Sequence, residues 1–83
     1  MSTTAAVRQF IETNFYVPEG SAIGDETSLL DLGIVDSTGV LEVTAFLEAE
    51  YGIVVRDDEI VPANMDSIGA ITRFVERKSA RAA

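Results

Sequence analysis

The sequence contains neither cysteine nor histidine. Without cysteine the chain has no disulfide, no thiolate metal ligand and no cysteine nucleophile. Without histidine it lacks the commonest general acid and base of enzymes, and the central residue of serine-dependent catalytic triads. These two absences predict a protein that is not an enzyme.

Positive charge is scarce and unevenly distributed. The formal net charge is −8, the pI is near 4.2, and no lysine or arginine occurs between positions 9 and 55. Nucleic acids and anionic membranes bind basic surfaces, so neither is expected as a partner. A partner protein with a basic surface is favoured instead. Four of the six basic residues lie near the end of the chain, namely Arg73, Arg77, Lys78 and Arg81.

No apolar run approaches the ~20 residues of a membrane-spanning helix. The first residues, MSTTAAVRQF, lack the basic start and apolar block of a secretory signal. We therefore expect a cytoplasmic protein that does not insert into membranes. With 83 residues, of which 47% are hydrophobic, the chain is expected to form one folded domain, residues 1–83, and to be a monomer.

Apolar residues recur at helical spacing in four segments. The expected helices cover residues 3–15, 37–51 and 57–61, and a fourth runs from residue 66 or 67 to residue 78. A long connection over residues 17–35 carries several apolar residues and is expected to pack on the core. These residues are Leu29, Leu30, Leu32 and Ile34. The predicted fold is all-α, a small four-helix bundle with a long first connection and a short third helix.

Particular residues mark the ends of these helices. Gly52 is expected to close the second helix, and Pro62 to stop the third. Asp66 is the expected N-cap of the fourth helix. The ordered core should cover residues 3–78, with residues 79–83 frayed.

The dipeptide Asp36-Ser37 stands at the entrance of the predicted second helix. Both residue types are leading helix caps, which is the simplest explanation for them. A helical wheel, however, places Ser37, Leu41 and Glu48 on one exposed side, with Ala45 beside them. The start of a helix also favours an anion such as a phosphate ester. Without a histidine or cysteine to activate it, Ser37 cannot act as a nucleophile unaided, so any modification of it would need another enzyme.

Several segments in the right order resemble the acyl carrier protein and peptidyl carrier protein family. They are SLLDLGIVDSTGVLEV, FLEAEYGI, DDEI and IGAITRFV, and the resemblance spans roughly residues 5–77. It implies that Ser37 carries a phosphopantetheine arm, joined through a phosphodiester by a phosphopantetheinyl transferase that uses coenzyme A. Acyl groups would then ride on the arm as thioesters. Asp36 matches the family residue that precedes the serine.

The resemblance also implies where partner enzymes bind. Leu41, Glu42 and Glu48 match positions on the second helix that family members use for this purpose. Thr38 stands where the family usually has leucine, and Ala45 lies beside the same exposed side. We expect all five to contact partners. Besides the transferase, these would be an adenylating ligase that loads acyl or aminoacyl groups, and downstream acyl-transfer enzymes.

The loop LGIVDSTG is closer in style to D-alanine carriers and nonribosomal peptide carriers than to carriers of fatty acid synthesis. The alternative hypothesis is an acidic helical interaction module that is never modified, either a degenerate carrier or an adaptor. It predicts that Ser37 is replaceable.

The acidic clusters Asp25-Glu26 and Asp57-Asp58-Glu59 lack the ligand spacing of calcium loops. No metal site is therefore expected.

Overall fold

The computed structural model describes residues 2–17 and 23–82, and the side chains among them up to residue 80. Within these residues it contains four α-helices and no β-strand. The all-α bundle with a short third helix is confirmed. The helices are α1 (Thr3–Asn14), α2 (Gly39–Tyr51), α3 (Pro62–Met65) and α4 (Ile68–Ala82), and a single 3₁₀ turn, Asp57–Glu59, precedes α3.

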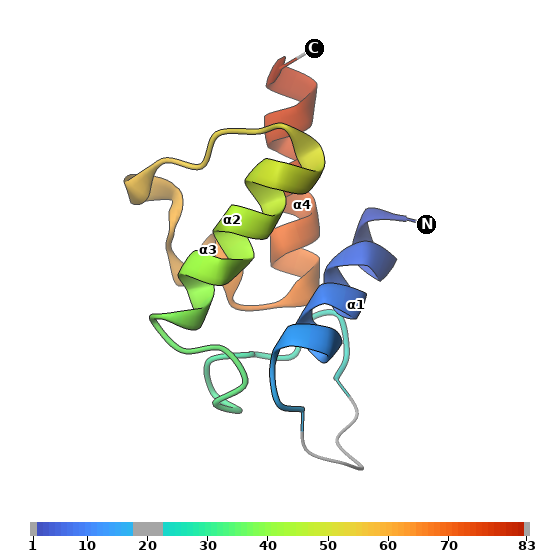
Figure 1. The fold of residues 1–83 in the computed structure, drawn as a ribbon, viewed down its shortest axis with the longest axis vertical. Coiled ribbons are helices and arrows are strands. Elements are labelled where there is room, and N and C mark those ends of the chain that lie inside the picture. Colours follow the sequence, from blue (N-terminus) through green and yellow to red (C-terminus); the bar gives the residue numbers. More distant parts are fainter. Residues whose placement is uncertain (1, 18–22, 83) are drawn as a thin grey trace.

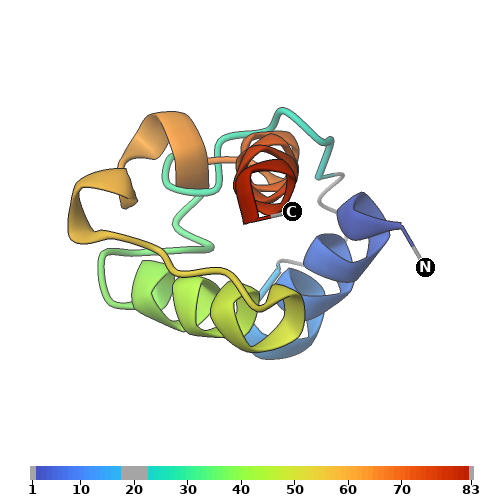
Figure 2. The ribbon, with the colours of Figure 1, turned by 90° about the horizontal axis from the view of Figure 1, so that it is seen from above.

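Helix α4 is the common partner of the other three helices, since it contacts α1, α2 and α3. Viewed from above, α1 and α2 lie on one side of α4, and α3 lies near its start (Figures 1 and 2). The apolar stripe predicted for α4 is buried, and it packs against buried residues of α1 and α2. These core residues include Val7, Ile11, Val43, Leu47, Ile68, Ile71, Phe74 and Val75.

The first connection, of which residue 17 and residues 23–35 are described, packs on the core as predicted, but not through all the expected residues. Leu29 and Ile34 are buried, whereas Leu30 and Leu32 are exposed. The Gly33 N–H donates to the Leu30 carbonyl, and the Ile34 N–H donates to the Leu29 carbonyl. This tight turn directs the two intervening leucines outward, so their predicted burial is wrong.

The N-cap of α4 is Ser67, not Asp66. The Ser67 hydroxyl oxygen accepts a hydrogen bond from the Ala70 N–H at 3.0 Å. The Asp66 carboxylate instead accepts from the Ser28 hydroxyl and from the Leu30 N–H. Asp66 therefore ties the first connection to the start of α4, a role that depends on residues far away in the sequence.

The third helical region also differs from the prediction. Residues 57–61 contain only the 3₁₀ turn, and Pro62 begins α3 instead of ending a helix. Proline suits the first helical position, because the N–H that it lacks would have no partner there. Helix α4 continues past Lys78 to Ala82, beyond the predicted end of the fourth helix at residue 78. Alanine at positions 80 and 82 favours that continuation.

Candidate functional site

The entrance of α2 is shaped by Asp36. Its Oδ1 atom accepts the Gly39 N–H at 2.6 Å, and its carbonyl accepts the Val40 N–H at 2.9 Å. The aspartate therefore holds the turn that leads into α2, whereas Thr38, the residue directly before the helix, makes no capping hydrogen bond with its side chain. Ser37 and Thr38 lie in the turn before Gly39, where α2 begins, so the predicted helix start at Ser37 was too early.

Gly39 brings the start of α2 close to the end of α1. A Cβ atom at this position would lie 2.7 Å from Cε1 of Phe15, so any other residue here would require the Phe15 ring to shift. Glycine costs about 0.5–1 kcal/mol relative to alanine within a helix. At Gly39 the absence of a side chain allows the close approach to Phe15, and this contact positions the turn that carries Ser37.

Ser37 and its neighbours on the predicted exposed side are all exposed. Leu41 is 56% exposed, whereas Val43 and Leu47 on the opposite side of the helix are buried. The residues placed on the exposed side are Ser37, Thr38, Leu41, Glu42, Ala45 and Glu48. The serine hydroxyl is therefore accessible to another enzyme, next to a surface that is partly apolar and partly acidic.

Glu48 has a structural role that the sequence pattern did not indicate. Its carboxylate accepts the Val55 N–H at 3.0 Å. Gly52 ends α2 in the left-handed conformation, with φ of 65°, as predicted. The chain then reverses, and Glu48 holds the segment that follows. This segment, residues 52–61, is called the second connection below.

An apolar pocket of about 210 Å³ opens beside Ser37. The first connection, α2, the second connection and α3 all contribute to its walls. The lining residues are Leu30, Val35, Asp36, Ser37, Val40, Ile60, Val61, Pro62 and Met65. No local pattern could reveal this pocket, because its walls come from segments that are far apart in the sequence.

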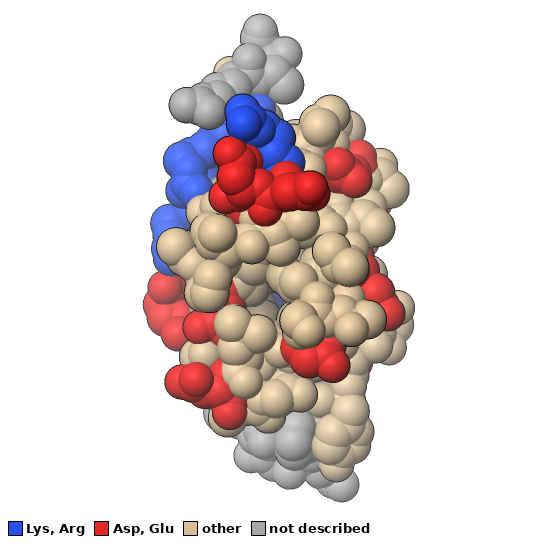
Figure 3. All heavy atoms as spheres, turned by 90° about the vertical axis from the view of Figure 1, so that its left-hand side faces the viewer, with Lys and Arg blue, Asp and Glu red and all other residues tan. Residues whose placement is uncertain are grey.

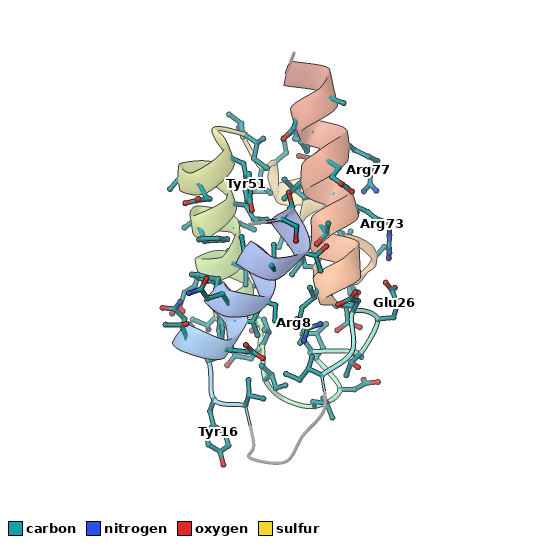
Figure 4. The ribbon with its side chains drawn as sticks, turned by 90° about the vertical axis from the view of Figure 1, so that its right-hand side faces the viewer. Arg8, Tyr16, Glu26, Tyr51, Arg73 and Arg77 are labelled. Atoms are coloured by element: carbon teal, nitrogen blue, oxygen red, sulfur yellow. The ribbon has the colours of Figure 1, made fainter. Side chains whose placement is uncertain are left out.

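The acidic clusters considered as metal ligands are instead paired with basic side chains. Asp25 pairs with Arg8, and Glu26 accepts hydrogen bonds from both terminal nitrogens of Arg73. The Arg73 hydrogen bonds lower the pKa of the Glu26 carboxyl. Figure 4 shows Glu26 next to Arg73 on the outer side of α4, with Arg77 further along the helix.

Two of the three residues of the cluster at 57–59 are paired too. Asp58 pairs with Arg56, and Glu59 pairs with Lys78 of α4. On the side that carries the second connection, basic side chains gather along the upper part of one edge, with acidic side chains directly beside them (Figure 3). In the parts of the chain that the structure describes, no three acidic side chains lie close enough to hold a metal ion.

No helix among the described residues has the length and apolar character needed to cross a membrane.

Comparison with known proteins gives two findings. Residues 5–75 match the family model described as "Phosphopantetheine attachment site". The chain is also 31% identical over 70 residues to a protein of Serratia sp. (strain ATCC 39006) named "Probable acyl carrier protein PigG", a match that covers 84% of this chain and 80% of that protein.

Proposed function

This chain belongs to the phosphopantetheine-binding family of acyl carrier proteins, and we propose that its arm is attached to Ser37. The protein is a carrier and not an enzyme: it bears acyl groups as thioesters on phosphopantetheine and delivers them between enzymes. The observation that carries the proposed attachment site is the exposed position of Ser37 in the turn fixed by the Asp36–Gly39 hydrogen bond.

The chemistry required of Ser37 is simple. Its hydroxyl oxygen forms a new bond to the phosphorus of coenzyme A that carries pantetheine, the nucleotide part leaves, and the hydroxyl proton is lost. We propose that the transferase supplies the base, because this chain has no histidine or cysteine to activate the hydroxyl. The product phosphodiester lies at the positive end of the α2 dipole, which favours the negative charge.

The pocket beside Ser37 supports a carrier whose cargo stays largely outside the bundle. Its volume of about 210 Å³ is below the ~300–1,000 Å³ of pockets that enclose drug-sized ligands. We propose that the cargo is a small acyl or aminoacyl group loaded by an adenylating ligase. The loop LGIVDSTG, with its similarity to D-alanine and peptidyl carriers, supports this assignment.

Acyl carrier proteins interact with phosphopantetheinyl transferases and acyl-handling enzymes. We propose that the exposed side of α2 is where these enzymes bind this carrier, and that Leu41, Glu42 and Glu48 contact them directly, with Thr38 and Ala45 at the margin. Two of these five residues are acidic and the chain is acidic overall, so enzymes with basic surfaces would be guided to this side.

We further propose one carrier domain over residues 1–83, acting as a monomer in the cytoplasm, where coenzyme A and the loading ligase are found.

The proposed attachment site is tested by intact-mass measurement. Wild type, Ser37→Ala and Ser79→Ala are each incubated with coenzyme A and a phosphopantetheinyl transferase of broad specificity. Ser79 is an exposed serine on α4 and serves as the matched control. We expect wild type and Ser79→Ala to gain one phosphopantetheine, and Ser37→Ala to gain none.

Two outcomes would contradict this proposal. Modification of Ser37→Ala would place the arm on another residue. No modification of any folded variant would favour the alternative, an acidic interaction module that is never modified. Circular dichroism of all three proteins establishes that they are folded.

A further inference from the structure

The second connection supplies one wall of the pocket beside Ser37, through Ile60 and Val61. Few apolar contacts hold this segment. Ile53 is its one buried side chain, Val55 is partly buried against the core, and Val54 is largely exposed. Polar contacts add to these apolar ones.

Most of these polar contacts converge on Glu59, the residue that directly precedes Ile60. Its Oε1 atom accepts the Arg56 N–H at 2.9 Å, which closes the 3₁₀ turn. The same carboxylate accepts from Nζ of Lys78, at 2.9 Å to Oε1 and 3.1 Å to Oε2. The Glu59 carbonyl accepts from Nδ2 of Asn64 at 2.9 Å. Glu59 thus links the second connection to α3 and to α4.

Lys78 is a firm attachment point for this link. It follows Phe74 and Val75 on α4, and both of these side chains are 2% exposed. Its Nζ atom lies 5.9 Å from the centre of the Phe74 ring, a distance suited to a cation–π contact. Lys78 therefore connects the second connection directly to the core helix.

The Glu59–Lys78 pair is more shielded from water than the other pair between α4 and a connection. The Glu59 and Lys78 side chains are 21% and 18% exposed, whereas those of Glu26 and Arg73 are 66% and 56% exposed. Ion pairs strengthen as water is excluded from them. Hydrogen bonds from the Arg56 N–H and from Lys78 also lower the pKa of the Glu59 carboxyl, so it is charged near neutral pH.

We propose that the Glu59–Lys78 pair positions Ile60 and Val61 beside Ser37, and that it thereby determines how tightly modifying and acyl-handling enzymes bind this end of the carrier. The inference rests on the proposed attachment at Ser37. Neither charged residue lines the pocket, so both act through the segment that they hold. They are positioning residues that make no contact with the arm.

The first test measures transferase kinetics with the carrier as the varied substrate. Lys78→Met removes the charge of the pair, and Lys78→Arg retains it. Glu26→Gln is the matched control, because it removes a pair between α4 and the first connection, away from the pocket. We expect Lys78→Met to raise KM for the carrier roughly threefold to tenfold, with kcat within about twofold of wild type. Lys78→Arg and Glu26→Gln should keep KM near the wild-type value.

The second test is amide hydrogen exchange of Ile60 and Val61 in the unmodified proteins. Their N–H groups donate to the carbonyls of Asp57 and Glu59. In Lys78→Met we expect these amides to exchange roughly threefold to tenfold faster, because the segment opens more often. In Glu26→Gln their exchange should match wild type.

A wild-type KM in Lys78→Met overturns the proposal, whatever the exchange rates show. An equal rise of KM in Glu26→Gln also overturns it, since the effect would then be general. Failure of the attachment at Ser37 is distinguishable, because wild type itself would not be modified. In that case the exchange rates decide whether the pair positions the segment.

Discussion

The two connections of this carrier are held in place by different means. The first connection buries Leu29, Ile34 and Val35 in the core. The second buries only Ile53, and depends on the carboxylates of Glu48 and Glu59 for its position. The first lies between α1 and α2 and the second between α2 and α3, and the first contributes more buried side chains to the hydrophobic core.

This difference matters because the pocket beside Ser37 lies between the two connections. Leu30 and Val35 of the first form one wall, and Ile60 and Val61 of the second form another. Segments with few buried apolar contacts open more readily than the core. The wall from the first connection should therefore be rigid, and the wall from the second adjustable.

Of the variants that test this difference between the two connections, a truncation in the first connection should have the largest effect on the free energy of unfolding. Leu29 is fully buried, so Leu29→Ala should lower the free energy of unfolding by about 2–5 kcal/mol. Val61 is partly exposed, and Val61→Ala should cost less than about 1 kcal/mol. Urea unfolding of both variants measures the two values. Equal losses would show that the second connection belongs to the core after all.

A smaller loss is expected from Asp66→Ala. This change leaves the Ser28 hydroxyl and the Leu30 N–H without their acceptor in the first connection. Unpaired polar groups that are partly buried cost about 1–3 kcal/mol. Asp58→Ala is the control, because its pair with Arg56 is exposed and should contribute almost nothing. Urea unfolding in which the two variants lose the same stability would argue against the tie through Asp66.

A still smaller effect is expected from Glu59 of the second connection, whose contribution to the free energy of unfolding should depend on pH. The pKa of Glu59 is lowered from its ordinary value of 4.5 by hydrogen bonds from the Arg56 N–H and from Lys78. A lowered pKa contributes stability that is present above the unfolded value and is lost as the pH falls through the folded value. Protonated glutamic acid then resembles glutamine.

The measurement compares unfolding free energies of wild type and Glu59→Gln in urea. The difference should be fully present near about pH 6 and should shrink progressively as the pH falls below 4.5, the ordinary pKa of the Glu59 carboxyl. Glu26→Gln should show a smaller difference at the higher pH, because the Glu26–Arg73 pair is more exposed. A Glu59→Gln difference that is unchanged by acid would mean that the charge of Glu59 does not hold the segment.

Local patterns predicted the features that depend on local physics. Spacing of apolar residues located α1, α2 and α4, and the helical wheel correctly placed Leu41 outside the core, because helix geometry relates sequence spacing directly to position on a face. The end of α2 at Gly52 was predicted from another local rule, because a residue in the left-handed conformation, usually glycine, commonly follows a helix.

The errors involve residues whose role is set by distant partners. Asp66 is a residue type that commonly caps helices, but its carboxylate instead accepts hydrogen bonds from the Ser28 hydroxyl and the Leu30 N–H. Pro62 can either stop or start a helix, and the sequence does not say which. Glu59 was one of three acidic residues in a row, and only the folded chain brings Lys78 to it. The pocket was missed because its walls are joined only by folding.

Leu41→Ala should have the smallest effect on stability and a measurable effect on function. Leu41 is 56% exposed on α2, one turn from Ser37, so its truncation should change the free energy of unfolding by no more than about 0.5 kcal/mol. Leu47, on the buried side of the same helix, is the control, and Leu47→Ala should cost about 2–5 kcal/mol. Turnover of the modified carrier by an acyl-handling enzyme should fall in Leu41→Ala, because an exposed apolar side chain next to the arm is available for contact. A large drop in the melting temperature of Leu41→Ala would instead mean that this side of α2 is packed within the carrier, and would leave Glu42 and Glu48 as the remaining candidates for partner contact.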